Sequence, residues 1–289
     1  MKQNQTFIIA ALSLAALLVY LFVSAPTPLP QTGQSAQGMV TNQALFNILA
    51  AENAAIRSLY TSEIVGPGLK QGLKFQEGWK SAEVNAGPLP ALMLREMSGI
   101  LQRDMPDISL FLGSDYPIVP ANLFKGVQVE HFQQLRASKK PQFFKDESTG
   151  RYTAMYPDLA VAQACVKCHN EHSKTPKTDW ALNDIMGATT WLYPRQKVAV
   201  PEVLKAVRSL RQAGVETYSL YLKKVAGFEP DKRPTVGKQW PKEGFYLPDA
   251  ATFQAEMEKR NAQTTLKLIL QLQEKEHASS VSASSPKPS

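Results

Sequence analysis

Residues 164–188 of the chain read ACVKCHNEHSKTPKTDWALNDIMGA. They begin with a C-x-x-C-H run, in which two residues separate Cys165 from Cys168 and His169 follows directly. In an exported protein this run is typical of covalent attachment of a c-type haem. The two thiols add to the haem vinyl groups as thioethers, and the imidazole is placed to bind the iron from one side. The run therefore predicts Cys165 and Cys168 as attachment sites for one haem c and His169 as the proximal iron ligand.

Three other interpretations of this run are open. A thioredoxin-like redox pair uses C-x-x-C beside a βαβ pattern, and no such pattern is visible in the sequence. A structural zinc site needs about four ligands, and here only His172 could join the run. A plain disulfide would leave His169 without a role. Cys165 and Cys168 are the only two cysteines of the chain, which favours haem attachment.

The composition is that of an ordinary globular protein with a sizeable core, because 44% of the 289 residues are hydrophobic and 20% are charged. The formal net charge of +7 would favour acidic redox partners or anionic lipid head groups. The basic residues are dispersed, so we expect no nucleic-acid partner. We also expect no enzymatic activity, because no catalytic constellation is visible beyond the haem run.

The N-terminus carries an uncharged apolar run over residues 7–23. At about 17 residues this run is at the short end for a membrane helix, and a cleaved signal peptide is the alternative. Val23-Ser24-Ala25 resembles a cleavage box, but Pro26 would follow the cut, where proline is poorly tolerated. We therefore expect residues 1–25 to be a retained anchor. It would place the remainder on the periplasmic side of the bacterial inner membrane.

Further along the chain, helical and extended patterns alternate. Gly66-Pro67-Gly68 is expected to end the first helix, Gly214 is a candidate break in a later one, and Asp249 is the predicted N-cap of the last. Residues 141–157 have the pattern of a β-hairpin and residues 185–193 that of a final strand. Helical periodicity covers residues 41–65, 91–102, 127–137, 201–226 and 249–275.

The sequence offers three candidates for a distal iron ligand. Met93 and Met97 are four residues apart and so share one face of a predicted helix. Methionines at such positions fill gaps in a core, and the functional alternative is that one thioether binds the iron. His131 is a third candidate. His172 lies only three residues after His169, so both cannot bind opposite faces of one iron, and we expect His172 to be exposed.

Four segments resemble a known family of single-haem c-type domains with a PAS-like fold. These domains are extracytoplasmic sensor modules of bacterial histidine kinases and nucleotide cyclases, and stand-alone cytochromes in cyanobacteria. The T-D-W of residues 178–180 and the D-x-x-G-A of residues 184–188 are the specific part of the resemblance. The matching segments are Arg57-Ser58-Leu59-Tyr60-Thr61, Pro88-Leu89-Pro90-Ala91, Ser114-Asp115-Tyr116-Pro117 and residues 164–188.

The resemblance covers roughly residues 41–194 and implies an α+β fold, in which a PAS-like antiparallel sheet has flanking helices and the haem lies against the sheet. Around this domain we expect a linker over residues 26–40, a helical extension over residues 195–276 and a disordered tail over residues 277–289. The last helix is expected to pack on the domain or on a second copy, which would make a homodimer.

The resemblance also bears on the sixth iron ligand. In one cyanobacterial branch of the family this ligand is a cysteine on the helix before the segment that matches Ser114-Asp115-Tyr116-Pro117. The present chain has no spare cysteine, and the corresponding helix carries Met93 and Met97. We therefore predict Met93 as the sixth ligand, with Met97 and then His131 as alternatives, and a five-coordinate iron stays open.

Two functions follow as hypotheses. The first is a membrane-anchored redox or small-ligand sensor, in which a redox change or a diatomic gas alters the haem and a signalling partner detects the change. The second is a one-electron carrier of a respiratory chain, because a His/Met iron has a raised potential. Signalling relatives continue into a second membrane span and a cytoplasmic output domain, whereas here the helical extension follows residue 194.

Overall fold

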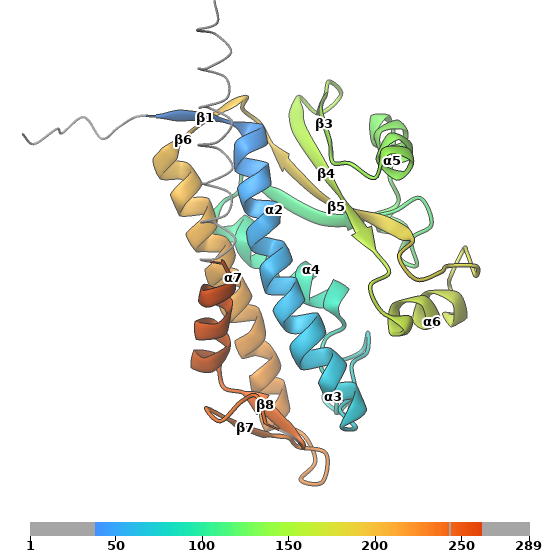
Figure 1. Cartoon of the computed structure of the whole chain (residues 1–289), viewed down its shortest axis with the longest axis vertical. Coiled ribbons are helices and arrows are strands. Elements are labelled where there is room, and N and C mark those ends of the chain that lie inside the picture. Colours follow the sequence, from blue (N-terminus) through green and yellow to red (C-terminus); the bar gives the residue numbers. More distant parts are fainter. Residues whose placement is uncertain (1–37, 243, 262–289) are drawn as a thin grey trace, which may run out of the picture. The chain divides into compact units, whose positions relative to one another are not determined.

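A four-stranded antiparallel sheet packs against long helices in this computed structural model (Figure 1). The strands are β2 (Ser109–Gly113), β3 (Gln142–Asp146), β4 (Arg151–Leu159) and β5 (Ile185–Tyr193), in the order β2-β5-β4-β3. β3 and β4 are the predicted hairpin, and β5 is the predicted final strand. An antiparallel sheet with flanking helices, as expected from the sequence, is therefore confirmed.

The structure describes residues 38–242 and 244–261. The predicted anchor over residues 1–25, nearly all of the predicted linker and the predicted tail lie outside the described residues. Within the described part of the chain, none of the helices is both long and apolar enough to cross a bilayer. The described residues from Met39 onward belong to one compact unit.

Helices cover both faces of the sheet, because successive residues of a strand point to opposite sides. Leu110, Ala154 and Trp191 are paired neighbours on β2, β4 and β5, and they join the larger core. Phe111 and Met155 point the other way, toward α5 (Val127–Ser138). The larger core is formed with α2 (Asn42–Ser58), α4 (Pro90–Asp104) and α7 (Val200–Ala226).

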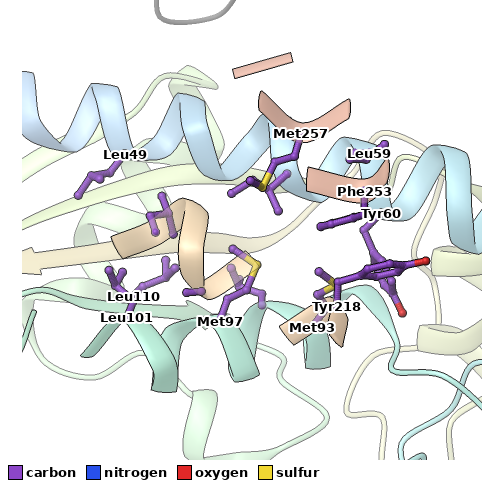
Figure 2. Packing of buried hydrophobic residues seen from close by; sticks show 14 of the residues in the cluster. Leu49, Leu59, Tyr60, Met93, Met97, Leu101, Leu110, Tyr218, Phe253 and Met257 are labelled. Carbon is purple, nitrogen blue, oxygen red and sulfur yellow. The ribbon is translucent and has the colours of Figure 1, made fainter. Parts of the chain in front are cut away.

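The helical extension is part of this larger core. Leu210, Tyr218 and Tyr221 of α7 are fully buried in the same cluster as the residues of α2 and α4. Figure 2 shows part of this packing, with the methionine sulfurs inside it. The expected break at Gly214 is wrong, because α7 continues through it. A Cβ at Gly214 would lie 3.3 Å from both Ile56 Cγ2 and Met257 Sδ, so this glycine permits close helix packing.

The first helix also ends later than expected. Gly66-Pro67-Gly68 does not stop it, because α2 passes through a π-helical segment, η1 (Leu59–Val65), into α3 (Gly66–Lys70). Pro67 occupies the first turn of α3, where its missing amide hydrogen is not needed. The chain turns away at Gly72, whose φ of +94° suits glycine.

Two pairs of short strands form separate small sheets. β1 (Met39–Thr41) pairs antiparallel with β6 (Lys197–Ala199), so the last residues of the predicted linker already form a strand. β7 (Thr235–Gly237) and β8 (Tyr246–Pro248) form a parallel pair. Residues 250–261 are helical. The prediction that Asp249 is their N-cap is confirmed, because its Oδ1 accepts a hydrogen bond from the Thr252 amide at 2.8 Å. The structure also contains η2 (Pro120–Asn122) and α6 (Gln163–Glu171).

Candidate functional site

The C-x-x-C-H run forms the short helix α6, in the connection between β4 and β5 (Figure 1). Cys165 and Cys168 are three residues apart and so lie on one side of the helix, and His169 is four residues after Cys165. Both thiols are free. No residue of α6 is buried. The helix therefore presents two accessible thiols and an imidazole on one turn.

Trp180 connects α6 to the segment that follows it. Cys165 and Val166 pack against a buried cluster of Ala160, Trp180 and Met186. The Asn170 side chain holds the Trp180 backbone from both sides: its Nδ2 donates to the Trp180 carbonyl at 3.0 Å, and its Oδ1 accepts from the Trp180 amide at 2.9 Å. Trp180 of the T-D-W segment therefore supports the attachment helix by packing against Cys165 and Val166.

The D-x-x-G-A segment holds the residues on both sides of the cluster around Trp180 in place. Asp184 Oδ2 accepts from the Ala181 amide at 2.8 Å, and the Asp184 carbonyl accepts from the Ala160 amide at 2.9 Å. At Gly187 a Cβ would overlap the Gly113 carbonyl oxygen of the neighbouring strand. Only glycine therefore allows β2 and β5 to pair at this end of the sheet.

Two more of the matching segments converge on the same region. Ser114 Oγ donates to the Met186 carbonyl at 2.6 Å and accepts from the Tyr116 amide at 3.1 Å. The Tyr116 ring then meets Trp180 edge to face, with ring centroids 6.2 Å apart. From the first segment, Arg57 donates through Nη1 to Asp158 Oδ1 at 2.7 Å. Segments far apart in the sequence thus contact the residues that precede and follow α6.

The site's electrostatics favour a neutral imidazole. Partial burial lowers the pKa of His169, while the nearby Asp158 carboxylate raises it and His172 lowers it further. A neutral imidazole has the free ring nitrogen that a metal ion needs. Burial also raises the pKa of the Cys168 thiol, and the Glu77 carboxylate adds to this effect. His172 itself lies with Nε2 3.6 Å from Glu77 Oε1.

These residues fit a c-type haem by their chemistry. Two free thiols flank one turn and an imidazole follows, which is the donor set that the cofactor requires. Among the described residues, the buried Trp180 Nε1 and Arg57 Nε have no hydrogen-bond partner. Each is a donor that an anionic or polar group of a cofactor can accept from. No group of three or more His, Cys, Asp or Glu in the described part of the chain is arranged as a metal site.

The structure does not bring the predicted distal ligands into the cluster around Cys165. Met93 and Met97 are buried in the larger core between the helices (Figure 2). His131 lies on α5 and stacks on Phe144, with ring centroids 3.8 Å apart. The sixth ligand therefore stays a prediction.

Sequence reasoning missed several residues of the site. Met186, inside the D-x-x-G-A segment, is the methionine that shares the cluster of Cys165. Neither the clamp of Asn170 on Trp180 nor the pair of Arg57 and Asp158 was foreseen. For Met186 the signal was its position in the specific segment; for the side-chain pairs the sequence has no local signal.

The comparison with family models matches residues 34–194 to the Tll0287-like family. No curated protein and no solved structure matches the chain. The matched residues include α2, the whole four-stranded sheet and α6, and their span agrees with the 41–194 expected from the resemblance. Since the match covers more than half of the sequence, this chain belongs to the Tll0287-like family, a cyanobacterial cytochrome-like family.

Proposed function

We propose that this chain carries one haem c, attached through thioethers at Cys165 and Cys168, with His169 as the proximal iron ligand. The observation that carries the proposal is the geometry of α6, where two free, accessible thiols share one turn with an imidazole. When bound, the haem would supply one-electron redox chemistry and an iron that can bind a small ligand. The cytochrome-like family supports the same assignment.

The protein's own residues have distinct parts in this proposal. The two thiols tether the cofactor, so that it stays bound in either oxidation state. The neutral His169 imidazole provides the ligand nitrogen. Asn170 and Trp180 hold the helix against the sheet, which limits how far the imidazole can move.

For the physiological role we propose a redox or small-ligand sensor with a PAS-like domain on the periplasmic side of the inner membrane, held there by the N-terminal segment. A diatomic gas at an open or displaceable sixth position is the candidate ligand, and a signalling protein the candidate partner. Met93 remains the predicted sixth ligand, with Met97 and His131 as alternatives. The second candidate is a one-electron carrier, which the net charge of +7 favours because it steers acidic partners.

Haem attachment is tested by producing the full chain in a host that matures c-type cytochromes. We expect the purified protein to weigh one covalent haem more than its polypeptide and to show haem spectra in both oxidation states. Replacing both Cys165 and Cys168 by alanine should abolish the covalent adduct, while His169→Ala should keep the adduct and change the spin state. A colourless wild-type protein with only the polypeptide mass would refute the proposal.

The two roles are separated by exposing the reduced protein to CO or NO. A ligand-bound spectrum favours the sensor, whereas an unchanged spectrum with fast electron exchange favours the carrier. Met93→Ala tests the predicted sixth ligand by a change of spin state. If the spectrum is unaltered, Met97→Ala, His131→Ala and Met186→Ala follow.

A further inference from the structure

Arg57 is held in one place near the junction of α2 and η1, where α2 continues directly into the π-helical segment. Its guanidinium donates to Asp158 Oδ1 at 2.7 Å and to Thr189 Oγ1 at 3.2 Å. The Arg57 and Asp158 side chains are only 23% and 26% exposed. Two opposite charges are thus fixed where solvent screens them less than at the surface.

The pair lies beside the attachment helix. The register of β4 against β5 shifts between Asp158 and Leu159, so the strand is irregular where it leaves the sheet toward α6. Irregularities of this kind redirect side chains and are common next to functional sites. Ala160, two residues after Asp158, belongs to the buried cluster against which Cys165 packs, and the attachment helix begins three residues later, at Gln163. Asp158 therefore lies at the end of β4 from which the chain enters the attachment helix, close enough for its charge to act on a haem held there.

Charge near a haem changes its reduction potential in a defined direction. Reduction adds one electron to the ferric haem and so removes one positive charge from the iron. A fixed carboxylate nearby stabilises the ferric form and lowers the potential, whereas a fixed guanidinium raises it. Here the Arg57 guanidinium is hydrogen-bonded to the Asp158 carboxylate, so each charge offsets the effect of the other on the potential.

We infer that the Arg57–Asp158 pair sets the reduction potential of the haem by balancing two opposite charges beside the attachment helix. This inference rests on the proposed haem attachment. Both residues are positioning and tuning residues, since neither is assigned as an iron ligand. Together with Thr189 they connect α2, β4 and β5 at one point, so the balance depends on the sheet and the helix keeping their relative places.

The experiment measures the midpoint potential of the full haem-loaded protein by titration with dithionite as reductant and ferricyanide as oxidant. Asp158→Asn should raise the potential, because it leaves the guanidinium uncompensated. Arg57→Gln should lower it, because it leaves the carboxylate uncompensated. The double variant should return toward the wild-type value, and Arg57→Lys, which keeps the charge, should stay near it.

A matched control is the exposed pair of Lys145 and Glu147 at the turn of the hairpin. It lies at the far end of β4, roughly 25 Å from Asp158 along the strand. Lys145→Gln and Glu147→Gln make the same changes of charge and should leave the potential unchanged. Thermal melting of every variant shows whether the fold is kept.

The sign of the two shifts decides the outcome. A purely structural role would open the site to water in both variants and shift the potential the same way in each. Shifts of one sign, or shifts no larger than those of the control, would overturn the inference while leaving haem attachment intact. If the wild-type protein carries no covalent haem, the proposed function itself fails, and this is seen in its mass before any titration.

Discussion

Leu210→Ala tests whether the helix beyond the family match is part of the folded core. Leu210 of α7 is 0% exposed and belongs to the larger core. Removing a fully buried leucine side chain costs about 2–5 kcal/mol, through lost burial and the cavity left behind. We take about 3 kcal/mol here, which is a large share of the roughly 5–15 kcal/mol that stabilise a typical domain. The melting temperature should fall by about 6–12 °C.

The measurement is chemical unfolding followed by circular dichroism, with thermal melting alongside. Leu204→Ala is the matched control, because Leu204 is on the same helix and is 58% exposed. Its effect should stay within about 0.5 kcal/mol. If Leu210→Ala costs no more than Leu204→Ala, then α7 does not form part of the core and the reasoning is refuted.

The same reasoning applies to the loss of the whole helix. α7 contributes five large, buried side chains, at about 1.5–3 kcal/mol each. The sum of about 8–15 kcal/mol equals the whole stability of a typical domain. A chain that ends at residue 194 should therefore not unfold cooperatively. A cooperative transition near the full-length melting temperature would contradict this expectation. The five side chains are Val203, Leu210, Tyr218, Tyr221 and Val225.

Three further predictions concern other contacts. Gly187→Ala should destabilise the fold by about 1–3 kcal/mol in denaturant titrations, because its Cβ would overlap the backbone of β2. The control Gly99→Ala, in open space on α4, should instead stabilise the fold by about 0.5–1 kcal/mol. If both variants change the stability equally, the Cβ of residue 187 does not overlap β2. Arg211→Met should cost about 3–5 kcal/mol in the same titrations, since the guanidinium donates two 2.7 Å hydrogen bonds to the buried Glu52; a loss below about 1 kcal/mol would show that the pair is not important for stability. Burial and a hydrogen bond to a carboxylate raise the pKa of Tyr193 to about 12, so the stability it contributes is complete below pH 10 and is lost as the pH rises through 12. Tyr193→Phe should therefore weaken the alkaline loss of stability between these pH values, measured by melting at each pH, and an unchanged pH profile would exclude this contribution.

The elements that sequence patterns predicted well are those whose signal is local. Residues 91–102 form α4 within two residues at either end, because prolines start the helix and its apolar face repeats every turn. The hairpin over residues 141–157 has strand patterns around a polar turn, and β3 and β4 follow them. The spacing of Cys165, Cys168 and His169 predicted that they lie together, and the structure places all three on α6, while their role as haem ligands stays a prediction.

The wrong predictions of helix ends concern residues that are compatible with two different local structures. Glycine and proline at 66–68 were expected to end a helix, but proline in a first turn is compatible with a new helix that follows directly. Gly214 was expected to break α7, whereas it lets Ile56 and Met257 approach the helix. A pattern shows that a side chain is small; it does not show whether the reason is a turn or a neighbour.

The placement of Met93 and Met97 shows a second limit of prediction from sequence periodicity. Periodicity correctly put Met93 and Met97 on one face of a helix, but it could not show which element covers that face. In the structure the face is covered by the larger core, which includes residues of α7. Periodicity cannot predict pairs such as Arg57 with Asp158 either, because 101 residues separate them in the sequence.

The helix α2 explains why the segment after residue 194 matters for the site. Glu52 on α2 binds Arg211 of α7, and Arg57, five residues later, binds Asp158 next to the attachment helix. Because Leu49 and Ile56 are buried on the same helix, core packing opposes any rotation of α2 that would move one pair without the other. The position of the Arg57 charge therefore depends on α7, although α7 lies outside the residues that match the family model. The unit that supports the site is accordingly larger than the unit that identifies the family.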